Sequence, residues 1–227
     1  MEHHFDTELD VLKQKLLTMA SHAETAVNQA LQALTQRDLE LALRVKEDDR
    51  IIDQFELEID DLAIQLLTKA PLAGNLRLVT TAMKISQNLE RVGDEASKIA
   101  KRARDLSQEP PVKITIDLPR MAGLALAMLK SALDAFVNHD SAAARAIIPR
   151  DKEVDALNKR IHEDLAQHMV ANPDTIGRCL NWMVASKSLE RIADHAKNVA
   201  EEVVYLCDAQ DIRHSGGKDQ SAPVAGP

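Results

Sequence analysis

The sequence predicts an all-α protein built from two tandem three-helix bundles that arose by internal duplication. The chain of 227 residues is 45% hydrophobic, so it can form a large core, yet it is only 2% aromatic and has just 7 Gly. Sheets and tight hairpins depend on aromatic, β-branched and Gly residues, so this composition favours helices. Long stretches with apolar residues at helical spacing, and the similarity of the two halves, support the same fold class.

The first half contains three long helical patterns. Apolar residues recur at helical spacing through residues 5–36, and no Gly or Pro interrupts them. Asp38 is then the predicted N-cap of a second helix that stops before Pro71 and Gly74. A third helix is predicted from residue 75 to residue 106.

The second half repeats this plan after an extended segment. Helices are predicted over residues 119–138, over 140–171 with a kink near Pro149, and over 173–209. We therefore expect four regions in chain order: a first bundle (1–108), a linker (109–118), a second bundle (119–210) and a disordered tail (211–227).

The two halves share a detailed internal similarity. A shift of 100 residues places the segment 83–96 on the segment 183–196, with Met, Ser, Leu, Glu, Arg, Asp and Ala recurring in register. A shift of 102 residues relates the acidic residues of the second helices: Asp38 to Asp140, Asp49 to Asp151, and Asp53 to Asp155. The protein is thus expected to be a duplicated three-helix unit with an elongated body.

Acidic pairs at i, i+4 recur in both halves. Like charges at this spacing share one face of a helix and repel each other weakly, so four repeated pairs are unexpected on a purely solvated surface. The pairs are Asp49 with Asp53, Glu90 with Asp94, Asp151 with Asp155, and Glu190 with Asp194.

The helix register predicts that these pairs meet. Adjacent antiparallel helices bring together residues that are equidistant from their shared turn. In the first half, the four acids lie 16 to 22 residues from the turn edges Pro71 and Gly74, and the second half repeats this arrangement around Asn172 and Asp174. Four carboxylates at one level need cations, and oxygen donors suit Fe, Mn, Mg, Ca or hydrated Zn. We therefore predict one metal site in each half.

An alternative is that nearby cations of the chain neutralise these acids in ordinary ion pairs. Arg91, Arg191 and neighbouring lysines are available for this role, and such pairs contribute little stability at a surface. His195, beside Asp194, is either a further ligand or a solvated or capping side chain. No His follows a Glu by three residues, which counts against a ferritin-like di-iron site.

A longer acidic stripe in the first half has no full counterpart. Glu56 and Asp60 extend the Asp49/Asp53 pair at helical spacing. At the positions related by 102 residues, the second half carries Asn158 and His162.

Composition and missing motifs exclude several function classes. With 36 acidic and 28 basic residues the formal charge is −8, so the chain has no overall attraction for nucleic acid or anionic lipid. Cys179 and Cys207 are too few for a disulfide framework, and the start of the sequence lacks the pattern of a secretory signal. The apolar run 121–129 is too short to cross a bilayer. We expect a cytoplasmic, non-enzymatic protein without direct membrane insertion, because phosphate loops, nucleophile elbows and zincin motifs are also missing.

The acidic motifs of the third and sixth predicted helices resemble the paired motifs of the PhoU family. They read Glu90-Arg-Val-Gly-Asp94 and Leu189-Glu-Arg-Ile-Ala-Asp-His-Ala-Lys-Asn-Val-Ala-Glu201. The resemblance spans about residues 5 to 210 and includes the acidic pairs of the second helices. Asn75 departs from the Asp that the family usually has before Leu-Arg, which affects local capping or a contact.

The resemblance implies a phosphate regulator with metal bound to carboxylates. Its multinuclear iron or zinc clusters would involve Glu90/Asp94 and Glu190/Asp194 together with the acids of the second helices. It also implies a negative regulator, often homodimeric, that acts on the ATPase subunit of the phosphate-specific ABC transporter and on a phosphate-sensing histidine kinase. The rival hypotheses are a helical-bundle carboxylate metalloenzyme or iron-binding protein, and a helical scaffold whose acids are only solvated.

Overall fold

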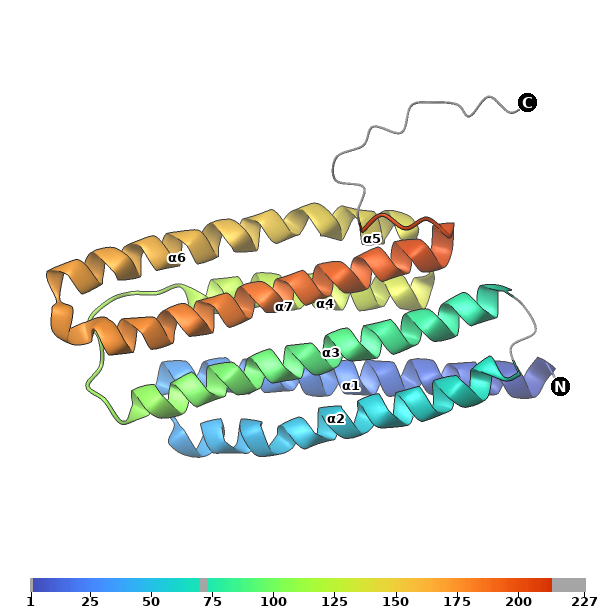
Figure 1. The fold of residues 1–227 in the computed structure, drawn as a ribbon, viewed down its shortest axis with the longest axis horizontal. Helices are drawn as coiled ribbons and strands as arrows, with labels where there is room; N and C mark the ends of the chain where they lie inside the picture. Colours follow the sequence, from blue (N-terminus) through green and yellow to red (C-terminus); the bar gives the residue numbers. More distant parts are fainter. Residues whose placement is uncertain (1, 70–72, 214–227) are drawn as a thin grey trace, which may run out of the picture.

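A computed structural model describes residues 2–69 and 73–213 of the chain, and within them it contains helices and no strand. Figure 1 shows long helices lying side by side in an elongated body. In chain order they are α1 (Glu2–Gln36), α2 (Leu39–Leu67), α3 (Ala73–Ser107), α4 (Leu118–Asn138), α5 (Ser141–Ile147), the 3₁₀ turn η1 (Ile148–Arg150), α6 (Asp151–Ala171), the 3₁₀ turn η2 (Pro173–Thr175) and α7 (Ile176–Asp208). The predicted all-α fold class is confirmed.

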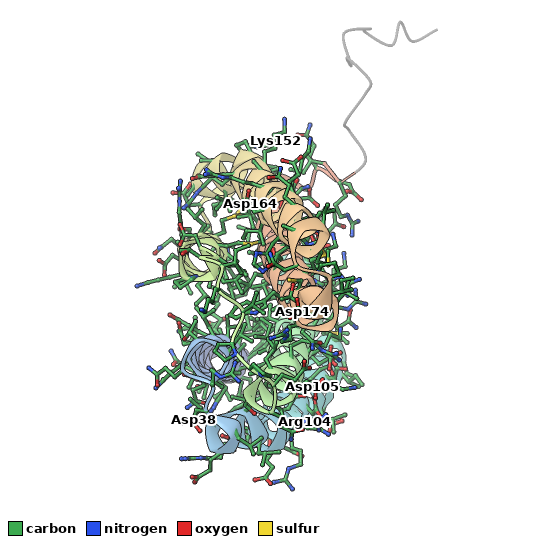
Figure 2. The ribbon with its side chains drawn as sticks, turned by 90° about the vertical axis from the view of Figure 1, so that its left-hand side faces the viewer. Asp38, Arg104, Asp105, Lys152, Asp164 and Asp174 are labelled. Carbon is green, nitrogen blue, oxygen red and sulfur yellow. The ribbon has the colours of Figure 1, made fainter. Side chains whose placement is uncertain are left out.

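The helices form two bundles that share one continuous core. Helices α1, α2 and α3 pack together, α4 to α7 form the second group, and α3 packs along α7. Seen along the helices, α2 and α6 occupy opposite ends of the stack, and the other long helices lie between them (Figure 2). Buried side chains from both halves belong to a single hydrophobic cluster, so the halves are joined by core packing rather than by the linker alone.

The duplication is visible in the backbone of the first turn of each half. Arg37 and His139, related by 102 residues, both adopt positive φ angles, of 60° and 52°. The next residues, Asp38 and Asp140, each accept a hydrogen bond from a backbone N–H three residues later, at 3.0 and 2.9 Å. The predicted N-cap at Asp38 is therefore present, and the same device begins the equivalent helix of the second half.

The two halves differ where a proline falls inside the equivalent helix. Helix α2 runs without interruption, whereas its counterpart is divided into α5, η1 and α6 around Pro149. Proline lacks an N–H and clashes with the preceding turn, which explains the break. The expected kink takes the form of one 3₁₀ turn, because Ile147, Ile148 and Asp151 around it keep right-handed helical backbone angles. Helix α3 begins two residues earlier than the expected start at residue 75.

The segment between the bundles is extended, as its prolines predict. Val112, Ile114 and Ile116 are half-buried against the core, while the residues between them are exposed. Arg178, at the start of α7, donates a hydrogen bond of 3.0 Å to the carbonyl of Pro110 and holds the segment in place. Most of the predicted disordered tail, residues 214–227, lies outside the described residues.

Helix α4 is the most apolar helix of the chain. Among the described residues it alone is long and apolar enough to cross a membrane by length and composition. Half of its apolar window is buried inside the protein, where α4 packs against α7 and α1. This is the environment expected of a core helix in a bundle.

Candidate functional site

The first acidic cluster lies between α2 and α3. Asp49 and Asp53 project from α2, and Glu90 and Asp94 project from α3, close enough that their charges act on one another. Glu56 of α2 also acts on Glu90. The acids that the register places at one level of the bundle thus lie near enough to interact electrostatically.

Burial and mutual repulsion raise the pKa values of carboxyl groups in this cluster. Burial, followed by the charges of Asp94, Glu56 and Asp53, raises the pKa of Glu90. Burial also raises the pKa of Asp49, although a hydrogen bond of 2.9 Å from the Ser97 hydroxyl lowers it in part.

Two further acids extend the cluster along α2. Burial, with the charges of Asp60 and Asp53, raises the pKa of Glu56. The Oδ1 atom of Asp60 is buried and accepts no hydrogen bond from the described residues. The part of the acidic stripe that sequence analysis left without a counterpart therefore belongs to this cluster.

A glycine allows the two helices to approach closely at the cluster. A Cβ atom on Gly93 would lie 2.8 Å from Ile52 Cδ1 and 3.0 Å from Asp49 Oδ1. Both distances are shorter than ordinary van der Waals contacts. Gly93 thus lets Asp49 and Ile52 of α2 pack directly against α3, and the repeat-related position of α7 carries Ala193.

The second acidic cluster lies between α6 and α7 and has the same four acids. Asp151, Asp155 and Glu190 all act on the charge of Asp194, so the predicted grouping is present in this half as well. Asp151 is only 5% exposed and Glu190 9% exposed. Burial first, and then the charges of Asp151 and Glu190, raise the pKa of Asp194 to about 6.

Two lysines of α7 enter the second cluster. Lys197 Nζ lies 3.0 Å from Asp151 Oδ2, and Lys187 Nζ lies 2.5 Å from Glu190 Oε2. The hydrogen bond to Asp151 raises the pKa of Lys197, so its ammonium group keeps its proton. The alternative of internal neutralisation therefore applies to these two acids of the second half.

The arginines expected to neutralise the acids have different roles. Arg191 pairs with Glu95, at 3.3 Å, instead of with the second cluster. Arg91 acts on Glu90 and Glu56 only through its charge. The compensating lysines could have been found from the internal alignment, because a shift of 100 residues places Lys197 on Ser97 and Lys187 on Gln87.

A cavity of about 420 Å³ lies between the two clusters, where α3 crosses α7. It is lined by four repeat-related pairs: Arg91 and Arg191, Asp94 and Asp194, Glu95 and His195, and Lys98 and Asn198. His195 Nδ1 lies 3.2 Å from Asn88 Oδ1 on α3. The imidazole therefore takes part in the contact between the halves, and burial lowers its pKa.

A buried glutamate in the wall of this cavity forms salt bridges with two half-exposed basic side chains. Glu95 is 4% exposed and pairs with Lys98 at 2.9 Å as well as with Arg191. Burial alone would raise the pKa of Glu95, but hydrogen bonds from Lys98 and Ser188 lower it overall. The cavity thus combines opposite charges that largely compensate one another.

The donor chemistry of the two acidic clusters fits a hard cation. Carboxylate oxygens are the ligands preferred by such ions, and both clusters contain a buried oxygen without a hydrogen-bond partner among the described residues, on Asp60 and on Asp151. In residues 2–69 and 73–213, no three His, Cys, Asp or Glu side chains converge closely enough to hold a metal ion as they stand. Mutual repulsion keeps carboxylates apart, so binding requires their side chains to rotate toward the cation.

Comparison with known proteins gives the family. The model of the PhoU domain matches the chain twice, over residues 16–103 and 118–203. The chain belongs to the PhoU family. The two matches coincide with the two bundles, so the resemblance seen in the acidic motifs is confirmed in both halves.

Curated relatives match over nearly the whole chain. The phosphate-specific transport system accessory protein PhoU homolog of Pseudomonas putida is 37% identical and covers 100% of this chain and 91% of its own length. The phosphate-specific transport system accessory protein PhoU of Escherichia coli is 32% identical over 98% of this chain and 92% of its own length. Both are named as accessory proteins and not as enzymes.

Solved structures of the family share the fold. The crystal structure of PhoU from Pseudomonas aeruginosa matches with a TM-score of 0.86 and 38% identity, covering 91% of this chain and 100% of that one. The crystal structure of the phosphate transport system regulatory protein PhoU from Streptococcus pneumoniae matches with a TM-score of 0.85 and 29% identity, covering 92% of this chain and 99% of that one.

Proposed function

We propose that this chain is a cytoplasmic negative regulator of phosphate uptake and signalling. The observation that carries the proposal is the family match in both bundles, together with relatives named as accessory proteins of the phosphate-specific transport system. A non-catalytic role agrees with a cavity between α3 and α7 that is lined by charged and polar side chains of both signs. Its long exposed helix faces suit contacts with other proteins.

The partners proposed are the ATPase subunit of the phosphate ABC transporter and a phosphate-sensing histidine kinase, with a homodimer of this chain as the regulating species. The test is co-purification of the chain with each partner from cells grown with abundant and with scarce phosphate. Phosphate-dependent retention of either partner supports the adaptor role. Failure to retain both, in cells that contain them, contradicts it and favours the metalloprotein rival.

Deletion of the gene provides the matching test in the cell. Without the regulator, a reporter that is normally repressed by phosphate should become active in phosphate-rich medium. The wild-type gene should restore repression. A reporter that stays repressed in the deletion strain would contradict the proposed negative regulation.

The regulator is also proposed to carry iron or zinc on its acidic clusters. The residues that would hold the metal are Asp49, Asp53, Glu90 and Asp94 in the first half, and Asp151, Asp155, Glu190 and Asp194 in the second. A bound cation would neutralise the carboxylates and cross-link the two helices of each cluster. Because two lysines already compensate the second cluster, the first is proposed to be the tighter site.

Metal analysis of the purified chain tests this part separately. A few iron or zinc ions per chain, lost together with a fall in melting temperature when a chelator is added, would agree with a structural or regulatory site. Loading far beyond a few ions, or oxidase activity, would favour an iron-binding protein or a metalloenzyme. Unchanged melting in metal-free protein would favour the helical scaffold.

A further inference from the structure

Helix α4 leaves much of its apolar surface uncovered. It contains the most apolar stretch of the described helices, yet only half of that stretch is buried inside the protein. Figure 1 shows α4 and α1 behind α7 and α3, and in Figure 2 these two helices lie along one side of the body, with no described helix over their outer side. The uncovered part of α4 includes Val137, which is 40% exposed, the exposed Ala127, and the half-buried Leu124 and Leu126.

The first half shows that the fold does not need apolar residues at these positions. A shift of 102 residues, the offset between the starts of the two family matches at residues 16 and 118, relates α1 to α4. Buried positions correspond, since Leu16 and Leu118 are 0% and 1% exposed. The outer positions differ: Leu124, Leu126, Ala127 and Val137 of α4 correspond to His22, Glu24, Thr25 and Thr35 of α1. The apolar outer side is therefore specific to the second half.

A groove between α1 and α4 adds to this surface. It has a volume of about 150 Å³, and leucines of both helices line it, among them Leu17, Leu126 and Leu133. The charged residues of its lining are Glu24, Lys130 and Asp134, and all three are exposed. The groove and the uncovered residues of α4 together form the α1–α4 face.

The charges along this face are of both signs and are not paired within the chain. Lys130 and Asp134 lie one helical turn apart on α4, and Lys13 and Glu24 lie on the adjacent side of α1. None of these four forms an ion pair in residues 2–69 and 73–213. Two bases and two acids select neither a strongly acidic nor a strongly basic partner, so their arrangement decides the occupant.

The two charges of α4 are complementary to those of a second copy. When two copies of α4 lie antiparallel about a two-fold axis at the level of Ala132, residues equidistant from it lie opposite each other. Lys130 and Asp134 are each two residues from Ala132. Each lysine therefore lies opposite the aspartate of the other copy, and Ala127 lies opposite Val137 in the same way.

The charges of α1 fit the same axis independently. Glu24 lies beside Leu126 in the groove, and the charge of Lys13 acts on His139 at the end of α4. Leu126 and His139 are six and seven residues from Ala132, on opposite sides of it. The axis thus brings Lys13 of one copy to the level of Glu24 of the other, and one arrangement pairs all four charges.

Other charges near the face do not oppose this arrangement. Arg120, at the start of α4, lies 3.6 Å from Glu153 of α6. Asp6 and Asp10 lie nearer the start of α1 than Lys13, and therefore past the end of α4. In the antiparallel arrangement, this is the end at which Arg120 of the second copy lies.

The size of the face suits a reversible dimer. Helix α4 has 21 residues, which gives a length of about 30 Å at 1.5 Å per residue. Two helices packed side by side are roughly 20 Å wide, so the face offers about 600 Å² in each copy. A total of about 1,200 Å² is at the lower limit of specific interfaces, and we expect a Kd of micromolar order.

We propose that two copies of the chain form a homodimer through the α1–α4 face, with α4 antiparallel to α4 of the second copy and Lys130 opposite Asp134. The inference rests on the homodimer of the proposed function and assigns its surface. It leaves the cavity between α3 and α7, on the other side of the body, open to cations and to other proteins.

Exchange of charges in the full chain tests this pairing. Sedimentation velocity from about 1 to about 100 µM gives the Kd of the dimer. Lys130→Glu or Asp134→Lys alone places like charges opposite each other at both symmetric contacts, and should raise the Kd at least about tenfold. The double variant Lys130→Glu/Asp134→Lys restores opposite charges and should return the Kd to within about threefold of the wild type.

The control Lys46→Glu makes the same change of charge at an exposed position of α2, outside the face, and should alter the Kd less than about twofold. All the substituted side chains are exposed, so the melting temperatures should stay close to that of the wild type. A dimer with an unchanged Kd in both single variants, or without recovery in the double variant, would overturn this surface and leave the homodimer standing.

A chain that stays monomeric over the whole range would overturn both the homodimer and its surface. A monomer that binds vesicles of phosphatidylcholine and phosphatidylglycerol would assign the face to lipid, and would overturn the inference as well. Neither measurement uses phosphate or a transporter subunit. The regulatory function, tested by co-purification, can therefore hold when this inference fails.

Discussion

The two acidic clusters occupy equivalent places in the duplicated fold, but they reach different electrostatic states. In the first, the neighbour of Asp49 is the neutral hydroxyl of Ser97. In the second, the equivalent Asp151 is paired with Lys197. Duplication thus fixes where the carboxylates lie, and one or two residues of the facing helix decide whether their charge is compensated from within the chain.

The positions beside the two clusters also differ in charge, and again the first half is the more acidic. Glu56 and Asp60 add negative charge to the first cluster. Their counterparts make internal hydrogen bonds: Asn158 Oδ1 accepts from the Ser186 hydroxyl at 2.7 Å, and His162 Nε2 lies 3.2 Å from the carbonyl of Met183. The first half thus has the more acidic site, whereas the second half uses the equivalent positions for hydrogen bonds between its helices.

Removal of equivalent carboxylates from the two clusters should give the largest difference between the halves, measured as a loss of Mn²⁺ affinity. The pair Asp53→Asn/Asp94→Asn deletes two carboxylates of the first cluster, and should weaken binding of Mn²⁺ about 100-fold. The equivalent pair Asp155→Asn/Asp194→Asn should change the affinity of the tightest site less than about threefold. Isothermal titration of the full chain measures both. Equal losses in the two variants would contradict the asymmetry.

Exchange of residues between the two clusters at the lysine positions should strengthen cation binding in the second half and weaken it in the first. Lys187→Gln/Lys197→Ser gives the second cluster the residues of the first, and should tighten Mn²⁺ binding there about tenfold by removing two positive charges. The converse change Ser97→Lys should weaken the first site by a similar factor. To measure one site at a time, each exchange is combined with the pair of Asn substitutions that disables the other cluster, and the combined variant is titrated with Mn²⁺. An unaltered affinity in both exchanges would show that the lysines do not compete with metal.

The pKa of Asp194 predicts a pH dependence of stability in chelator-treated protein. Its folded pKa, about 6, exceeds the ordinary value of an aspartate side chain, 3.8, so the folded state binds the proton more tightly than the unfolded state. This group therefore stabilises the fold least above pH 6, and its contribution grows as the pH falls from 6 toward 4.

The variant Asp194→Asn isolates this effect. After allowance for its partial exposure, the substitution should raise the free energy of unfolding by about 1 kcal/mol at pH 7 and by less at pH 4.5. Chemical denaturation at the two pH values measures the change. The variant Asp164→Asn on α6 is an exposed control outside the cluster. A larger gain at pH 4.5 than at pH 7 would have the wrong sign.

Substitution of Gly93, where α2 and α3 approach each other closely, should have the smallest effect on stability. Gly93→Ala gains helix propensity, but its methyl group must displace Ile52 and the Asp49 carboxylate, so we expect a net loss of about 0.5 kcal/mol. Gly123→Ala in α4 is the matched control, because a Cβ there meets nothing within 4 Å, and it should stabilise by about 0.5 kcal/mol. Thermal melts compare the two. Gains of equal size would mean that the helices separate at Gly93 without cost.

Much of the fold could be predicted from the sequence. The spacing of apolar residues, the N-cap at Asp38 and the 102-residue offset gave the helices and their duplication, because these are local properties of the chain. The kink at Pro149 was predicted because proline removes a backbone donor, but its form as a 3₁₀ turn was not. The packing of α3 along α7 was not predicted, because it depends on side chains from both halves.

The membership of the two acidic clusters was also predictable, whereas their charge balance was not. Antiparallel register places Glu90 and Asp94 beside the acids of α2 whatever their surroundings. Whether Lys197 reaches Asp151, or Arg191 instead turns to Glu95, depends on the orientation of long flexible side chains across α7. Only the three-dimensional structure distinguishes these partners.

We propose that the two repeated clusters differ in function: the first is proposed to bind a cation, whereas the second is paired with lysines of its own chain. Anomalous diffraction from crystals of the wild-type chain grown with Mn²⁺ tests it most directly, because it locates and quantifies the metal in each half. The account predicts a strong peak between α2 and α3, beside Asp49, Asp53, Glu90 and Asp94, and a weak or absent peak between α6 and α7. A peak of equal or greater occupancy beside Asp151 and Asp194, with the lysines displaced, would contradict it.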